Sequence, residues 1–359
     1  MAVCNRDRSR RSRVDVQVGA FSLPSSLANV HSSSCTPVDC TMQRYTIERT
    51  LSKALFGDVV LCRDTATGAM VAIKRMNMDA AMAQLVVGEP TPRHVAEDIV
   101  FEEHVNTALL GDGDGHPNVL AMRHSFVEGG MQHFVFDYCV HGELFQVTET
   151  LPNHRVNSAT AQRYFRDVVH GVAYVHAHGF AHRDLSLENV LVMANDSCVV
   201  CDFGLAAPLA HAKKPKVGKP FYMAPEVVAG DVCDLAAADV WSLGILLFVL
   251  LTGTPLVEVA SRADPRFQFL EMNGVRALIQ SWGMNDLFDT QCMAVLEAML
   301  AVDSRDRITV DNILRHPYLL RTTSNDSAHD VHDSHPSEPA ALRALKAATR
   351  AIDMTTFIL

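Results

Sequence analysis

Hydrophobic and polar positions alternate along the first third of the chain, in short runs separated by turn residues. Such alternation is typical of strands with one buried face. A single stretch between the third and fourth runs has apolar residues at helical spacing instead. The pattern therefore predicts a five-stranded antiparallel sheet with one helix. The predicted strands are 45–51, 57–63, 69–76, 121–128 and 132–139, and the predicted helix is 94–110.

Beyond about residue 143 the apolar positions recur every three to four residues, which is typical of amphipathic helices. The clearest helix is 161–176, which Asn157 or Ser158 can cap at its start and Gly179 can end. This part of the chain is predicted to be mainly helical. Further helices are predicted at 236–252, at 290–300 and in a short stretch that is capped by Thr309 and ends before Pro317.

The two ends of the chain lack a sustained apolar period. Residues 1–43 are rich in Arg and Ser, and residues 321–359 begin with a polar segment, so both are expected to be disordered tails that could dock regulators. Residues 339–352 could form a short amphipathic helix. The histidines of the second tail, His329, His332 and His335, could suggest a metal site, but a flexible acidic linker explains them more simply.

Composition sets limits on the class of protein. With 359 residues, 48% of them hydrophobic, the chain can bury a large core. Its formal net charge of −10 gives no reason to expect a nucleic-acid partner. The longest apolar run, 243–251, is too short to span a membrane. Nine scattered cysteines and no apolar segment after the Arg-rich start favour an intracellular protein, in the cytoplasm or nucleus.

Four short motifs follow one another in the chain. They are VAIK at 71–74, HRDLSLEN at 182–189, DFG at 202–204 and APE at 224–226. Each is common alone, but the ordered set resembles the protein kinase family over about residues 45–320. The resemblance implies an α+β fold of two lobes. These would be a sheet-rich N-lobe (44–138), a hinge (137–142) and a helical C-lobe (143–320), together forming a kinase domain at 44–320.

The resemblance also implies a phosphate-binding lysine. Lys74 on the third strand would contact the α- and β-phosphates of ATP. Its partner is expected to be Glu102, because Val105 and Leu109 then lie on the core face of the same helix. Glu103 is the alternative partner.

The family's remaining catalytic groups also have counterparts here. By this resemblance Asp184 would accept the proton of the substrate hydroxyl, and Asn189 and Asp202 would hold Mg²⁺. Glu226 with Arg307 resembles a structural ion pair, and Asp239 resembles an anchor beneath the catalytic loop. The expected nucleotide-site residues are Leu51, Gly57, Val59, Ala72, Phe136, Asp137, Cys139, Glu143 and Leu191, in addition to Lys74, Glu102 and Asp202.

Two features depart from the family pattern. The phosphate-covering loop, normally GxGxxG, has Ser52 and Ala54 in place of two glycines, which predicts weaker ATP binding. Serine/threonine kinases usually carry a lysine two residues after the catalytic aspartate and a threonine before APE, but this chain has Ser186 and Lys219. We hypothesise that the two residues are exchanged, so that Lys219 supplies the cation and Ser186 the hydroxyl. Two independent substitutions are the alternative.

Regulation and activity class follow from the same region. Residues 204–220 contain no Ser, Thr or Tyr, so phosphorylation of this segment cannot be the switch. The prediction is an ATP-dependent kinase that modifies serine or threonine in protein substrates. A pseudokinase that binds nucleotide or partners without catalysis is the alternative, and a tyrosine kinase is disfavoured because no Trp precedes the MAPE sequence.

Overall fold

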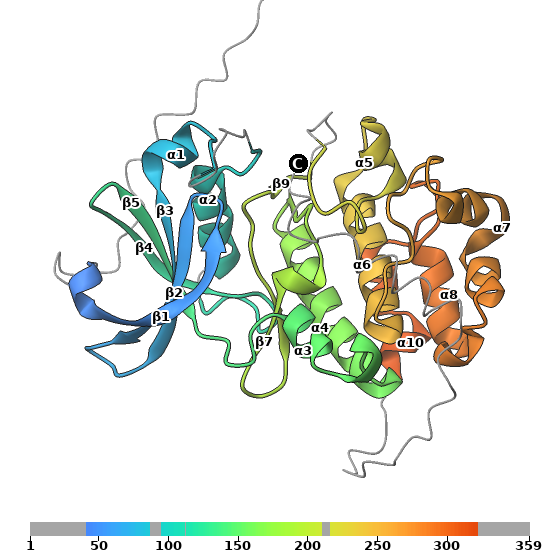
Figure 1. The fold of residues 1–359 in the computed structure, drawn as a ribbon, viewed down its shortest axis with the longest axis horizontal. Helices are drawn as coiled ribbons and strands as arrows, with labels where there is room; N and C mark the ends of the chain where they lie inside the picture. Colours follow the sequence, from blue (N-terminus) through green and yellow to red (C-terminus); the bar gives the residue numbers. More distant parts are fainter. Residues whose placement is uncertain (1–40, 87–94, 112, 210–215, 322–359) are drawn as a thin grey trace, which may run out of the picture.

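The chain was analysed as a computed structural model, which describes residues 41–86, 95–111, 113–209 and 216–321. Figure 1 shows a small lobe built around one sheet beside a larger, mainly helical lobe. This is the two-lobed α+β architecture predicted from the sequence. Most of both predicted tails, the helix predicted at 339–352 and the three histidines of the second tail lie outside the described residues.

The sheet of the small lobe is antiparallel, with the strand order β1-β2-β3-β5-β4. All five strands lie where short β-rich runs between turns predicted them, although only Tyr45 of β1 is buried and β5 is buried from Gln132 to Phe136. Two apolar clusters fill this lobe, one on each side of the sheet's central strands. The strands are β1 (Tyr45–Ala54), β2 (Gly57–Asp64), β3 (Met70–Asn77), β4 (Met122–Glu128) and β5 (Met131–Asp137).

Two helices accompany this sheet: α1 (Met78–Met82), and α2 (Ile99–Leu110), which is the helix predicted at 94–110. The predicted start was wrong by five residues. Asp98 caps α2, because its side chain accepts hydrogen bonds from the backbone N–H groups of Val100 and Phe101. Residues 95–98 are consequently not helical, and this places Glu97 outside the helix.

The larger lobe is organised around two long helices, α4 and α6. Asn157, one of the two predicted caps, caps α4 by accepting from the N–H of Thr160, and Thr309 caps α9 through the N–H of Asn312, as predicted. A large apolar cluster fills this lobe and extends to Val105 and Leu109 of α2, and a smaller one lies around Ala181 and Leu235. The helices are α3 (Leu144–Glu149), α4 (Ser158–Ala177), α5 (Pro225–Ala229), α6 (Leu235–Thr252), α7 (Pro265–Ser281), α8 (Thr290–Met299), α9 (Val310–Leu314) and α10 (Pro317–Leu320).

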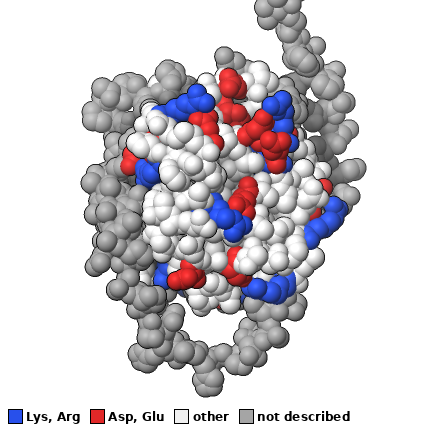
Figure 2. Space-filling model, turned by 90° about the vertical axis from the view of Figure 1, so that its right-hand side faces the viewer, with Lys and Arg blue, Asp and Glu red and all other residues white. Residues whose placement is uncertain are grey.

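Within the described residues, one helix, α6, has the length and apolar composition of a membrane span. Most of α6 is buried inside the larger lobe, as expected of a core helix. Figure 2 shows one end of this lobe, where acidic and basic side chains lie next to one another among uncharged residues. Ion pairs of the lobe include Arg262–Glu271, Arg276–Glu297, Arg305–Asp303 and Arg321–Asp289.

Four short strands shape the face of the larger lobe that meets the small one (Figure 1). They form two-stranded pairs, β6 with β9 and β7 with β8, and the HRD loop (182–189) connects the two pairs. Short loops between strands are a common position for catalytic groups, because the strands fix both ends of the loop. The strands are β6 (Phe180–Ala181), β7 (Val190–Val192), β8 (Cys198–Val200) and β9 (Ala207–Pro208).

Candidate active site

Lys74 lies on β3, and its ammonium group contacts two carboxylates. Its Nζ is 2.7 Å from Oε1 of Glu102 on α2 and 3.1 Å from Oδ1 of Asp202. Burial lowers the pKa of Lys74, but the two carboxylates raise it by more, so the side chain is charged at neutral pH. The side chain of Glu102 is 1% exposed, whereas that of Asp202 is 42% exposed and so accessible to a ligand. The structure thus pairs Lys74 with Glu102, as the core face of α2 predicted.

Glu103, the alternative partner, points elsewhere. Its Oε1 accepts a hydrogen bond from the hydroxyl of Ser125 on β4 and another, at 3.2 Å, from Nε2 of Gln132 on β5. Glu103 therefore attaches α2 to the sheet, while its neighbour Glu102 faces Lys74. Adjacent residues of a helix project about 100° apart, which explains why only one of the two acids can reach the lysine.

Asp239 on α6 holds the HRD loop from beneath, as predicted. Its carboxylate accepts from the backbone N–H groups of His182 and Arg183, both at 2.8 Å, and lies 2.9 Å from Nε2 of His176. Arg183 and Asp202 both have positive φ angles, of 69° and 65°. Such conformations are uncommon for residues other than glycine and are sustained by surrounding contacts, here including those of the buried Asp239.

Asp184 and Asn189 form the centre of this loop. Nδ2 of Asn189 donates to both the backbone oxygen and Oδ2 of Asp184, each at 2.7 Å. Because the amide nitrogen makes these two bonds, the carbonyl oxygen of Asn189 is the atom suited to a metal. With the carboxylate of Asp202 it gives the oxygen donors that Mg²⁺ takes from a protein when phosphates complete its coordination. The residues present therefore fit Mg²⁺ bound together with ATP.

The predicted adenine site consists of apolar side chains that the protein leaves partly uncovered. On β3, Ala72 is partly exposed between the buried Val71 and Ile73, and on β2, Val59 is partly exposed next to the buried Val60. An apolar face left open inside a fold is typical of a small-molecule site. Leu51 and Leu191 are partly exposed in the same way.

The hinge connects β5 to α3 at one edge of this apolar face. Phe136 is buried and pairs with Ala72 across the sheet. The side chain of Asp137 binds Arg123, with Nε 2.6 Å from Oδ1, which leaves the hinge backbone as the group suited to adenine. Burial raises the pKa of Cys139 to about 12, so its thiol stays protonated.

The phosphate-covering loop is a tight hairpin, in which β1 and β2 pair as far as Ala54 and Gly57. A Cβ on Gly57 would lie 2.0 Å from the backbone oxygen of Arg75, so this glycine is required by the close approach of β2 to β3. Phe56 turns inward and is 1% exposed within the apolar cluster of α1 and β3. Ser52 and Ala54 lie on the hairpin itself.

The ammonium group of Lys219 contacts Asp184 and Ser186 at the predicted substrate end of the site. Nζ of Lys219 is 3.0 Å from Oδ2 of Asp184 and 3.0 Å from Oγ of Ser186. Glu143 pairs with Leu191 across an isolated bridge, and burial raises the pKa of its carboxyl, helped by the nearby carboxylate of Glu188. The structure thus brings together the two residues whose exchange the sequence suggested.

Glu97 is a site residue that sequence reasoning missed. Its Cγ and Cδ lie 3.2 Å from the position that a Cβ on Gly204 would occupy, so its side chain lies against the DFG turn. Burial raises the pKa of Glu97, and Lys74 opposes that effect. The signal that could have located Glu97 is Asp98. An aspartate that caps a helix places the residues before it, here including Glu97, outside that helix.

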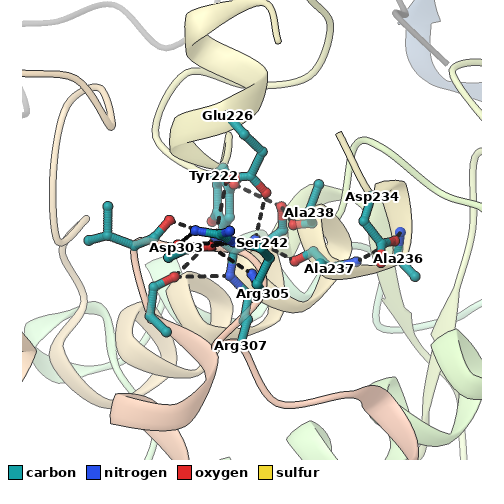
Figure 3. A network of polar contacts seen from close by, with 12 residues as sticks. Tyr222, Glu226, Asp234, Ala236, Ala237, Ala238, Ser242, Asp303, Arg305 and Arg307 are labelled. Carbon is teal, nitrogen blue, oxygen red and sulfur yellow. Dashed lines mark hydrogen bonds and ion pairs between the residues drawn. The ribbon is translucent and has the colours of Figure 1, made fainter. Parts of the chain in front are cut away.

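An ion pair joins Glu226 of α5 to Arg307 (Figure 3). Arg307, with a fully buried side chain, donates to Oε1 and Oε2 of Glu226 at 2.7 and 3.1 Å and to the backbone oxygen of Ala237 at 2.7 Å. Oγ of Ser242 on α6 donates to the backbone oxygen of Tyr222 at 2.8 Å. These contacts fix the segment that carries Lys219 to the core of the larger lobe, and the pair predicted from APE is present.

A sequence model of the family described as protein kinase domain matches residues 45–319, which is about three quarters of the chain. The chain belongs to the protein kinase family. Its phosphoryl donor is ATP, its metal is Mg²⁺, and its activity is that of a serine/threonine protein kinase acting on proteins.

Three relatives illustrate the similarity. Serine/threonine-protein kinase SRK2F of Arabidopsis thaliana is 30% identical over 287 residues, 78% of this chain and 75% of that protein. CBL-interacting protein kinase 11 of Oryza sativa subsp. japonica is 36% identical over 218 residues, 59% of this chain and 40% of the relative. Maternal embryonic leucine zipper kinase of Danio rerio is 30% identical over 298 residues, which are 79% of this chain and 39% of that protein. The aligned part is therefore well under two thirds of the latter two relatives.

Proposed function

We propose that the chain transfers the γ-phosphoryl group of ATP to serine and threonine hydroxyls of protein substrates through the cluster formed by Lys74, Asp184 and Asp202 with their partners. Asp184 accepts the proton of the substrate hydroxyl as the new bond to phosphorus forms. Lys74, held by Glu102, binds the α- and β-phosphates. Asn189 and Asp202 would hold Mg²⁺, which would neutralise charge on the phosphates.

The contact of Lys74 with both Glu102 and Asp202 supports this proposal most directly. These residues come from a strand of the small lobe, a helix of the small lobe and the DFG turn of the larger lobe, so the contacts form only when the lobes are correctly placed. A pseudokinase has no requirement for all these groups to converge. Their convergence favours a catalytic protein over a binding module.

Phosphoamino-acid analysis tests this proposal. The protein is incubated with labelled ATP, Mg²⁺ and a panel of generic protein substrates, next to an Asp202→Asn variant. We expect label on serine and threonine with the unsubstituted protein and little with the variant. Equal labelling by both would refute the assigned site, and ATP binding without any labelling would support the pseudokinase.

We also propose an intracellular location and regulators that bind the tails. The six described cysteines are free thiols, which suits a reducing compartment. One relative is named for its interaction with CBL, and here residues 1–43 and 321–359 flank the kinase domain. Immunofluorescence of the tagged full chain tests the location, and affinity capture with and without each tail tests the second idea.

A further inference from the structure

Lys219, in the segment that precedes APE, contacts both carboxylate oxygens of the proton acceptor Asp184. The backbone N–H of Lys219 donates to Oδ1 of Asp184 at 3.1 Å, while its Nζ lies 3.0 Å from Oδ2. The same ammonium group lies 3.0 Å from Oγ of Ser186, which is fully buried. Lys219 thus bridges two residues of the HRD loop, Asp184 and Ser186.

Gly218 makes this close approach possible. Its φ is +99°, and a Cβ there would lie 2.7 Å from the backbone oxygen of Arg183. On the other side of Lys219, the N–H groups of Tyr222 and Met223 bond to its backbone oxygen at 2.9 and 3.2 Å. The backbone of Lys219 is therefore fixed on both sides, with its side chain directed to the HRD loop.

The charges around Lys219 favour a role in catalysis. Burial lowers the pKa of Lys219, but Asp184 and Glu188 raise it by more, so the ammonium is charged at neutral pH. Phosphoryl transfer needs positive charge at the transferring group, where negative charge spreads over its oxygens. Lys74 already binds two carboxylates, and Ser186 carries no charge. The Lys219 ammonium, 3.0 Å from Oδ2 of the proton acceptor, is therefore a candidate cation for the γ-phosphoryl group in addition to Mg²⁺.

We propose that Lys219 is a catalytic residue whose ammonium binds the γ-phosphoryl group during transfer, with the Ser186 hydroxyl orienting that ammonium. This proposal rests on the proposed function. In the step, the substrate O–H bond breaks and its proton goes to Asp184, while the substrate oxygen forms a bond to phosphorus. The bond from phosphorus to the β-phosphate oxygen breaks, and ADP leaves with that electron pair. Lys219 remains protonated throughout.

The proposal also explains how the segment is placed without a phosphate. Residues 204–220 contain no Ser, Thr or Tyr, so no phosphorylated side chain there can anchor them. The contacts of Lys219 with Asp184 and Ser186 attach the segment directly to the HRD loop. The catalytic cation and the anchor of the segment would then be the same side chain.

Moving the lysine from position 219 to position 186, with a hydroxyl residue left at position 219, tests the proposal. The variants are Lys219→Thr, Ser186→Lys and both together, with Lys216→Thr as the matched control, because Lys216 is an exposed lysine three residues away. For Lys219→Thr we expect kcat to fall about 10²-fold, the scale of losing one charge-stabilising contact. ATP affinity, measured with a fluorescent nucleotide, should change little. The double exchange should recover at least about tenfold of the lost kcat, and Lys216→Thr should match the unsubstituted protein.

Two results would overturn the proposal. Unchanged or increased kcat in Lys219→Thr would mean that the lysine only neutralises Asp184 before substrate arrives. Additive losses in the double exchange would mean that the two residues act separately. Thermal melting shows whether a variant is misfolded. If Lys219→Thr is misfolded, Lys219→Met replaces it, because methionine keeps much of the length of the side chain without its charge. If Asp202→Asn abolishes transfer while Lys219→Met does not, the proposed function stands and this inference fails.

Discussion

Oε1 of Glu102 lies 2.7 Å from Nζ of Lys74, whereas the carboxylate of the next residue, Glu103, binds Ser125 and Gln132. These two adjacent acids of α2 thus have different roles. Glu102 holds the phosphate-binding lysine, and Glu103 attaches α2 to the sheet. This division separates effects on catalysis from effects on stability.

Replacing each acid by its amide should therefore give opposite results. Glu102→Gln is expected to lower kcat/KM about 10²-fold, because Lys74 loses the charge that positions it. Glu103→Gln should keep most of the activity and lower the free energy of unfolding by about 1 kcal/mol, the scale of one weakened hydrogen bond. Steady-state kinetics and chemical denaturation of both proteins measure the two effects. A larger loss of activity in Glu103→Gln would contradict the pairing.

The altered phosphate-covering loop should weaken ATP binding. Restoring glycine in a Ser52→Gly, Ala54→Gly double variant is expected to lower the KM for ATP roughly fivefold, or about 1 kcal/mol, because glycine lets the backbone approach the phosphates more closely. Gly57→Ala is unsuitable as a control, since its added Cβ would collide with Arg75. A low-micromolar KM for ATP in the unsubstituted protein would contradict this prediction.

The sequence predicted the elements of the fold well because their patterns depend on local burial. All five strands of the small lobe and the cap at Thr309 follow from period and spacing, whereas the Lys74–Glu102 pair was implied by the family resemblance, with helical spacing choosing Glu102 over Glu103. Glu97 and Phe56 were not predicted, because each turns inward through tertiary contacts with residues distant in the chain. The predicted start of α2 was too early, because the apolar spacing extends to residues before the Asp98 cap.

Asp64 is a buried acid that no sequence motif singles out, and it should make stability depend on pH. Its carboxylate accepts from Nε and Nη2 of Arg44 at 2.9 and 2.7 Å, and these bonds hold its pKa below the ordinary range. The unfolded chain has an aspartate pKa of about 3.9. The stabilisation is therefore present above about pH 4 and is lost as the pH falls through the lower folded pKa.

Denaturation of Asp64→Asn at several pH values tests this account. At pH 7 the variant should be less stable by about 3 kcal/mol, because the buried side chain of residue 64 no longer offers a charge to Arg44. The difference from the unsubstituted protein should shrink as the pH falls from about 4 towards 3. A difference that stays constant over this range would show that the stabilisation does not come from the ionised carboxylate.

Activity should not require phosphorylation of residues 204–220, which lie between DFG and APE. Because residues 204–220 offer no hydroxyl, protein made in bacteria and treated with phosphatase is expected to keep its kcat. Mass spectrometry of the treated protein confirms that it is unmodified. Strict dependence of kcat on an added upstream kinase would show that another residue of the chain acts as a phosphorylation switch.

The rate of phosphoryl transfer from ATP to a serine peptide, compared between the unsubstituted protein and Asp184→Asn, tests the central claim most directly. An amide at this position keeps the shape of the side chain but cannot accept the proton. We expect kcat to fall by about 10²–10⁴-fold, the range for a positioned general base, with ATP affinity little changed. Equal rates in the two proteins, or no transfer by the unsubstituted one, would contradict the assignment of Asp184 as the proton acceptor of an active kinase.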